Sequence, residues 1–192
     1  LPLLAVQLLW LNLVTNGIQH IALAAEPGEG DELHQPPRSP KEPIFNRLMI
    51  ERVISSALII GIVAFMLFKT LLEWGFSVDE ARNSTLLLMV LFENVHVFNC
   101  RSETLSIFRH SLLRNRILLL GTTAAQLIHI GAMYTPWLNE VLRIEPVSIE
   151  HWLDLLLLAL TVTAVMEIHK LYLHWSGRNT PGPQQGRSVE SA

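Results

Sequence analysis

The sequence predicts an all-α fold, an integral membrane bundle of five transmembrane helices. Half of its 192 residues are hydrophobic and only 16% are charged, whereas soluble domains carry roughly 25% charged residues. Five apolar segments are each long enough to cross a bilayer, which takes about 20 residues. These segments cover about 3–25, 50–72, 84–108, 117–135 and 151–173. We therefore expect one membrane domain over residues 1–175.

The connections between these segments are polar. The first, residues 26–47, contains five prolines, and the third, 109–116, is rich in arginine. The tail, 176–192, is rich in Gly, Pro, Gln and Ser, a composition that predicts disorder. These three regions are expected to lie outside the hydrocarbon layer.

Basic residues orient the helices, because cytoplasmic loops carry an excess of Lys and Arg. Most of them fall in the first connection, the third connection and the C-terminal end, whereas the opposite side holds only Lys69, Arg82 and Arg143. This asymmetry predicts an N-terminus outside and a C-terminus in the cytoplasm. The protein is then a multi-pass protein, with the plasma (inner) membrane as the expected location.

A polar stripe interrupts the first apolar segment. Asn12, Thr15 and Asn16 lie at positions i, i+3 and i+4, so they share one face of a helix, and Gly17 marks a weak point beside them. Their oxygens are suitable cation ligands, and a helix unwound near Gly17 would add backbone carbonyls. Interhelical hydrogen bonding is the equally weighted alternative.

Two carboxylates occur in the third segment. Glu93 lies in its apolar part, where an ionisable residue is by default a functional hypothesis. Glu103 follows near the end. The alternatives are a protonated acid bonded to another helix for Glu93 and an ion pair with Arg101 for Glu103. Gln126 and His129, in the fourth segment, are expected to make packing hydrogen bonds.

Several functional classes find no support in the sequence. Cys100 is the single cysteine and the eight histidines are scattered, so no metal-ligand spacing is present. There is no phosphate-binding glycine loop and no nucleophile elbow. We expect no catalytic residue in this chain and no nucleic-acid partner.

At the motif level, the chain resembles a known family. The run Val6-Gln-Leu-Leu-Trp-Leu-Asn-Leu-Val-Thr-Asn-Gly17, followed by Pro36-Pro37-Arg38, resembles the sixth transmembrane helix and the next cytoplasmic loop of calcium-pump-like P-type cation ATPases. The segment from Glu93 to Glu103 is similar to the eighth helix, and the later segments fit helices nine and ten. The resemblance extends from Leu1 to about Trp175.

The resemblance implies functional residues. In calcium pumps the sixth helix is unwound and supplies Asn, Thr and Asp ligands, positions that fall on Asn12, Thr15 and Asn16. A glutamate of the eighth helix follows an Asn-x-x-Ser pattern, which Asn99-Cys-Arg-Ser102 reproduces, so it falls on Glu103. The resemblance also implies that Pro36, Pro37 and Arg38 form a loop that links phosphorylation to helix movement. Glu93 has no ligand role in the family.

Two departures bear on the ion. Asn16 stands where the family has aspartate, and Arg101 is expected to add a positive charge near the same pocket. Affinity for divalent cations depends on the number of charged ligands. The resemblance therefore implies a transported cation, with Ca²⁺ as the first candidate, and the departures predict fewer ions per cycle or a monovalent ion.

By this resemblance, ATP and Mg²⁺ act only through upstream domains that are not in this chain, so the chain alone should hydrolyse nothing. Its expected partners are the lipid bilayer and the upstream membrane helices and cytoplasmic domains of the same pump. Two alternatives remain: a non-catalytic assembly or regulatory module from a degenerate or truncated pump, and a secondary transporter or channel that uses Glu93 as a proton relay.

Overall fold

The computed structural model describes residues 1–27, 47–102, 106–109 and 111–176, and within these ranges every regular element is a helix. Three helices in the described part are long and apolar enough to cross a membrane: α3 (Arg47–Glu73), α5 (Arg116–Tyr134) and α7 (Ile149–Trp175). The all-α prediction is confirmed to this extent. The five-span arrangement and the orientation of the termini remain predictions.

The first apolar segment forms a continuous helical run of three parts. These are α1 (Ala5–Trp10), a π-helical segment η1 (Leu11–Asn16) and α2 (Gly17–Ala24). The residues at both junctions keep right-handed helical dihedrals, with φ −60° and ψ −48° at Trp10 and φ −58° and ψ −46° at Gly17. The run thus changes its hydrogen-bond period without breaking.

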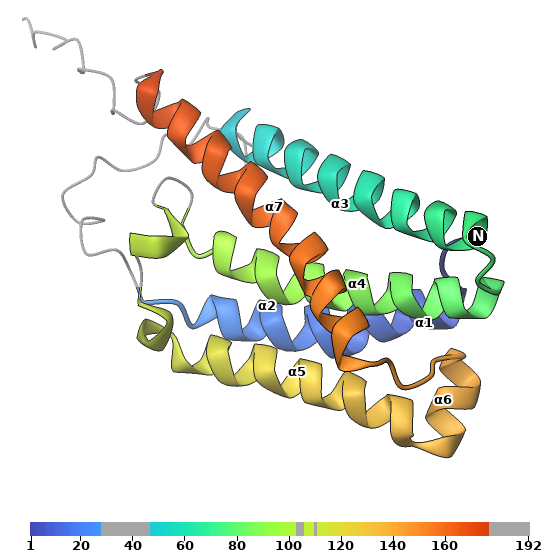
Figure 1. The fold of residues 1–192 in the computed structure, drawn as a ribbon. Helices are drawn as coiled ribbons and strands as arrows, with labels where there is room; N and C mark the ends of the chain where they lie inside the picture. Colours follow the sequence, from blue (N-terminus) through green and yellow to red (C-terminus); the bar gives the residue numbers. More distant parts are fainter. Residues whose placement is uncertain (28–46, 103–105, 110, 177–192) are drawn as a thin grey trace, which may run out of the picture.

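Helix α4 (Val78–Asn99) lies at the centre of the bundle and contacts α3, α7, α5, α2 and η1 (Figure 1). It begins with a capping box, in which the Ser77 hydroxyl accepts from the Glu80 amide and the Glu80 carboxylate accepts from the Ser77 amide. Leu86, Leu87 and Leu88 are consecutive and fully buried, so all faces of the helix are covered. The polar residues Asn83, Ser84, Thr85 and Asn99 of this helix are likewise buried in the protein.

The third predicted segment differs from the observed element. Helix α4 ends at Asn99, before the predicted end at residue 108, and the chain continues through short 3₁₀ helices at Ile107–Arg109 and Leu112–Arg114. The turn after α4 buries Arg101 and Ser102 against the bundle. The side-chain contacts of Arg101, described below, account for this early turn.

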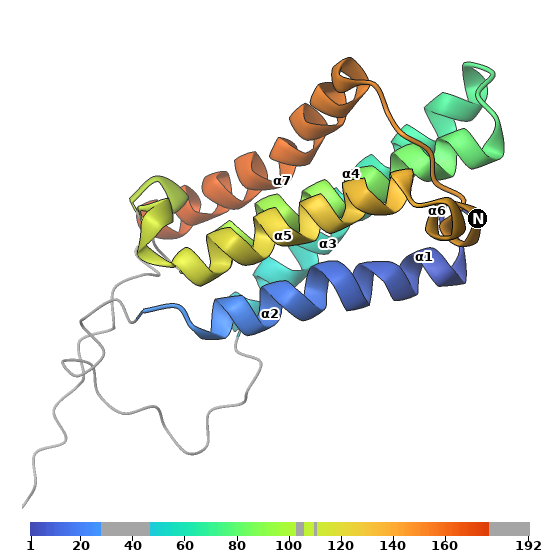
Figure 2. The same ribbon diagram turned by 90° about the horizontal axis from the view of Figure 1, so that it is seen from below.

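The chain alternates between the two ends of the bundle. The N-terminus, the turn between α3 and α4, and the short helix α6 (Pro136–Leu142) lie at one end, and the C-terminal ends of α2, α4 and α7 lie at the other (Figures 1 and 2). Proline begins α6, where its missing N–H costs nothing. Both the end of α2 and the start of α5 therefore lie at the same end as the turn after α4.

Candidate functional site

The π-helical segment carries the polar stripe. Gly17 donates its N–H to the carbonyl of Asn12, five residues back, rather than four. The unwound helix expected near Gly17 is not found, because this wider turn keeps the backbone hydrogen-bonded. Single π-helical turns inside α-helices occur frequently at functional sites.

The three stripe residues have different environments. Asn12 is exposed, whereas Thr15 is 1% exposed and Asn16 is half-buried. Asn12 donates to the carbonyl of Leu8 over 3.1 Å and accepts from Asn16 Nδ2 over 3.3 Å. The stripe therefore runs from the outer face of this helix into the bundle.

Glu93 of α4 meets the inner end of this stripe. Its Oε1 accepts a hydrogen bond from Asn16 Nδ2 over 3.3 Å. The hydroxyl of Thr15 lies near the same carboxyl, yet Thr15 Oγ1 and Glu93 Oε2 are buried without a hydrogen bond of ordinary geometry. Buried polar atoms normally have a partner, and the Thr15 hydroxyl and the Glu93 carboxyl are close enough to interact with each other.

The donor set is rich in neutral oxygens. Asn12, Thr15, Asn16 and Glu93 supply amide, hydroxyl and carboxylate oxygens, the atom type that hard cations bind. Among the described residues, no three His, Cys, Asp or Glu side chains come close enough together to hold a metal ion. The arrangement therefore offers one carboxylate and several neutral oxygens, and further ligands would have to come from elsewhere.

The other expected site residues cannot be placed. Glu103, Pro36, Pro37 and Arg38 lie outside the described residues, as does the tail from residue 177 onward.

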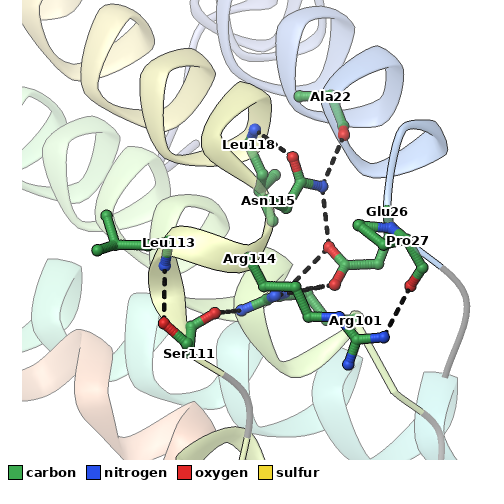
Figure 3. A network of polar contacts seen from close by, with 9 residues as sticks. All are labelled: Ala22, Glu26, Pro27, Arg101, Ser111, Leu113, Arg114, Asn115 and Leu118. Atoms are coloured by element: carbon green, nitrogen blue, oxygen red, sulfur yellow. Dashed lines mark hydrogen bonds and ion pairs between the residues drawn. The ribbon is translucent and has the colours of Figure 1, made fainter.

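The positive charge of Arg101 is balanced by a carboxylate. Its guanidinium makes a bidentate ion pair with Glu26, just after α2, with a shortest distance of 2.8 Å (Figure 3). Burial alone would raise the pKa of Glu26, but hydrogen bonds from Arg101 and Asn115, with the charges of Arg101 and Arg114, lower it below its ordinary value. Arg101 is thus paired with a carboxylate, whereas Glu103, beside which its charge was expected to act, lies outside the described residues, so that expectation stays a prediction.

A second polar chain crosses the bundle next to Glu93. Gln19 Nε2 donates to Asn94 Oδ1 over 2.6 Å, and Asn94 Nδ2 donates to Gln126 Oε1 over 2.8 Å. Trp10 Nε1 donates to His129 Nδ1 over 3.1 Å. Gln126 and His129 thus make the packing hydrogen bonds expected of them. The role of Asn94 was missed, although its place beside Glu93 in an apolar segment was a visible signal.

Comparison with known proteins identifies the family of this chain. The family described as "Cation transporting ATPase, C-terminus" matches residues 1–172. The chain is 32% identical over 166 residues to a "Probable cation-transporting ATPase F" of Mycobacterium tuberculosis, covering 86% of this chain and 18% of that protein.

Two relatives carry calcium in their names. The chain is 34% identical over 175 residues to mouse "Calcium-transporting ATPase type 2C member 2", covering 91% of this chain and 18% of that protein. It is 31% identical over 154 residues to a "Calcium-transporting ATPase" of Bacillus subtilis, and this match covers 80% of this chain and 17% of that protein. The chain thus spans about a fifth of the length of these relatives. It belongs to the family of C-terminal membrane domains of P-type cation-transporting ATPases.

Proposed function

We propose that this chain supplies part of the intramembrane cation-binding site of an ATP-driven pump. Asn12, Thr15 and Asn16 contribute oxygens from the first helical run, and Glu93 contributes the carboxylate from α4. Glu103, by its place in the family pattern, is a further ligand. The chain acts with the upstream helices and cytoplasmic domains of the same pump, in the plasma membrane.

The contact between Asn16 and Glu93 carries this proposal. It joins two helical runs through the half-buried carboxyl group of Glu93, close to the buried hydroxyl of Thr15. Polar and ionisable groups at membrane depth are costly and are kept mainly where they serve function. The π-helical turn at this position adds a second feature typical of functional sites.

The exposed position of Asn12 supports a shared site. Its side chain lies on the outer face of the first helical run, together with Leu8, Leu9 and Leu13, which are 49%, 65% and 69% exposed. A face that is open in this chain suits the upstream helices of the pump. Those helices would supply the ligands that one carboxylate and three neutral side chains lack, since Ca²⁺ takes six to eight oxygens.

The ligand charges bear on stoichiometry. Asn16 removes one carboxylate relative to the family pattern, and the carboxyl group of Glu93 lies next to it. Ca²⁺ is the first ion to test, because two relatives are named calcium-transporting ATPases. With one carboxylate placed at the stripe, we propose a single cation per cycle at this site.

Coupling would pass through the loop after α2. Pro36, Pro37 and Arg38 are proposed to link phosphorylation, which uses ATP and Mg²⁺ in the upstream domains, to movement of the first helical run.

Phosphoenzyme formation tests the proposal. The full-length pump would be incubated with ATP and, separately, with Ca²⁺, Mn²⁺, Mg²⁺, Na⁺ or K⁺ across a concentration series. Asn12→Ala and Glu103→Gln should raise the half-saturating cation concentration, and Asn16→Asp should change ion preference or stoichiometry. Glu140→Gln, which changes an exposed carboxylate in α6, is the matched control. Unchanged cation dependence in all three site variants would refute the proposal.

A further inference from the structure

Three helix ends meet in one hydrogen-bonded cluster, formed by Glu26, Arg101 and Asn115 and hereafter called the end cluster (Figure 3). Glu26 follows α2, Arg101 follows α4 and Asn115 precedes α5. The Arg101 side chain is 1% exposed and that of Glu26 is 15% exposed, so the ion pair is shielded from water. It lies at the end of the bundle that is predicted to be cytoplasmic.

Each polar atom in the end cluster has a partner. Arg101 Nε and Nη2 donate to the two Glu26 oxygens at 2.8 to 3.0 Å, and Nη1 donates to the carbonyl of Ser111 over 3.1 Å. Asn115 Nδ2 donates to Glu26 Oε2 over 2.8 Å and to the carbonyl of Ala22 over 3.1 Å, and its Oδ1 accepts from the Leu118 amide over 2.8 Å. Fully satisfied buried networks are rigid.

The end cluster joins the two helices that carry the candidate site. Asn16 and Glu26 are separated by α2, a helix of 8 residues or about 12 Å. Glu93 and Arg101 are separated by the last part of α4, a similar length. The Glu26–Arg101 pair therefore fixes one end of α2 to one end of α4, and the Asn16–Glu93 hydrogen bond crosses between the same helices about two turns away.

The pair also anchors two segments proposed to act in transport. Glu26 lies just after α2 and precedes, in the sequence, the proposed coupling residues Pro36, Pro37 and Arg38. Arg101 donates a hydrogen bond to the carbonyl of Ser111, ten residues further along the chain, and Glu103 lies between them in the sequence. In the candidate site, by contrast, Thr15 Oγ1 and Glu93 Oε2 have no hydrogen-bond partner of ordinary geometry.

We propose that Glu26 and Arg101 are positioning residues for transport, which hold α2 and α4 in register so that Asn16 and Glu93 can bind one cation together. This inference rests on the proposed function. The pair does not itself bind the ion, because both carboxylate oxygens and the guanidinium are already occupied by each other and by Asn115 and Ser111.

The test compares single and exchanged charges in the full-length pump. Glu26→Gln and Arg101→Gln should each raise the half-saturating cation concentration for phosphoenzyme formation from ATP by about tenfold. Arg101→Lys, which keeps the charge but loses the bidentate geometry, should give a smaller rise. The exchanged pair, Glu26→Arg with Arg101→Glu, should recover part of the affinity lost in the single variants. The control is Arg47→Gln, which removes an exposed ion pair with Glu51 at the start of α3.

Phosphoenzyme formed from inorganic phosphate without the cation is measured alongside, because it reports a folded pump independently of cation affinity. Retained phosphoenzyme with a shifted cation dependence supports the positioning role. An unshifted cation dependence in both single variants overturns the positioning role. Loss of the phosphoenzyme formed from inorganic phosphate in every variant, including Arg101→Lys, also overturns it, because the pair would then serve folding alone. If Asn16→Asp and Glu93→Gln also leave cation dependence unchanged, the proposed function itself fails.

Discussion

Asn16 of the first helical run donates a hydrogen bond to Glu93 of α4 over 3.3 Å, although 77 residues separate them in the chain. The same Asn16 amide also contacts Asn12 Oδ1. A side chain that stands where the family has an aspartate is thus placed beside a carboxylate from another helix. This pairing is the basis of the first prediction.

Glu93→Gln is expected to raise the half-saturating cation concentration of the full-length pump by at least tenfold, which corresponds to about 1.4 kcal/mol. The substitution keeps the shape of the side chain but removes the negative charge on which divalent-cation affinity depends. Cation-dependent ATP hydrolysis in membrane vesicles measures it. If the cation affinity equals that of the Glu140→Gln control, Glu93 has a purely structural role.

Trp10→Phe is expected to lower the free energy of unfolding by about 1 kcal/mol, the net value of one hydrogen bond. The indole N–H of Trp10 donates to Nδ1 of His129, which is fully buried, and the substitution leaves that nitrogen without a donor. Thermal unfolding of the purified pump in detergent measures the change.

Trp137→Phe is the matched control for this prediction, because Trp137 is 65% exposed. Equal effects of the two substitutions would show that the Trp10–His129 hydrogen bond contributes nothing of its own.

Gly121→Val is expected to destabilise the packing of α5 on α2. A Cβ at Gly121 would lie 3.2 Å from Ile18 Cγ2 and 3.3 Å from the Ala22 Cβ, both tighter than ordinary contacts. Overpacking of this kind costs about 1–3 kcal/mol, and small residues at helix interfaces are what permit close approach in membranes. The midpoint of thermal unfolding in detergent should fall.

Gly131→Val on the same helix provides the comparison, since a Cβ at Gly131 meets nothing within 4 Å. The prediction fails if both valine variants unfold at the same temperature.

The stability of the pump is expected to depend on pH through Glu26. Its pKa in the folded protein is lowered from an ordinary value of 4.5, against the effect of burial, by Arg101, Asn115 and Arg114. The folded state therefore binds this proton less readily than the unfolded state. The stabilisation is present above pH 4.5 and is lost as the pH falls through the folded pKa.

Glu26→Gln removes this titration, so the loss of stability between neutral and acidic pH should be smaller than in the unmodified protein. Unfolding midpoints across a pH series measure the difference. Parallel pH profiles for the two proteins would mean that another carboxylate controls acid sensitivity.

Local features of the chain were readable from the sequence. The abundance of apolar residues predicted a helical membrane protein, and every regular element in the described ranges is a helix. The spacing of Asn12, Thr15 and Asn16 placed a polar stripe on the first helical run, where the structure has it. These features depend on residues within one or two helical turns of each other, and so on local geometry alone.

Which helices come together was decided by tertiary structure. Apart from this stripe the predicted segments are mostly apolar, so their periodicity does not specify which face of one helix meets which neighbour. The contact of Asn16 with Glu93 and the pairing of Arg101 with Glu26 across 75 residues both depend on how the first helical run packs on α4. The sequence alone determined that polar groups stand within apolar segments, and packing determined their partners, because a polar group inside the bundle can bond only to what the adjacent helix presents.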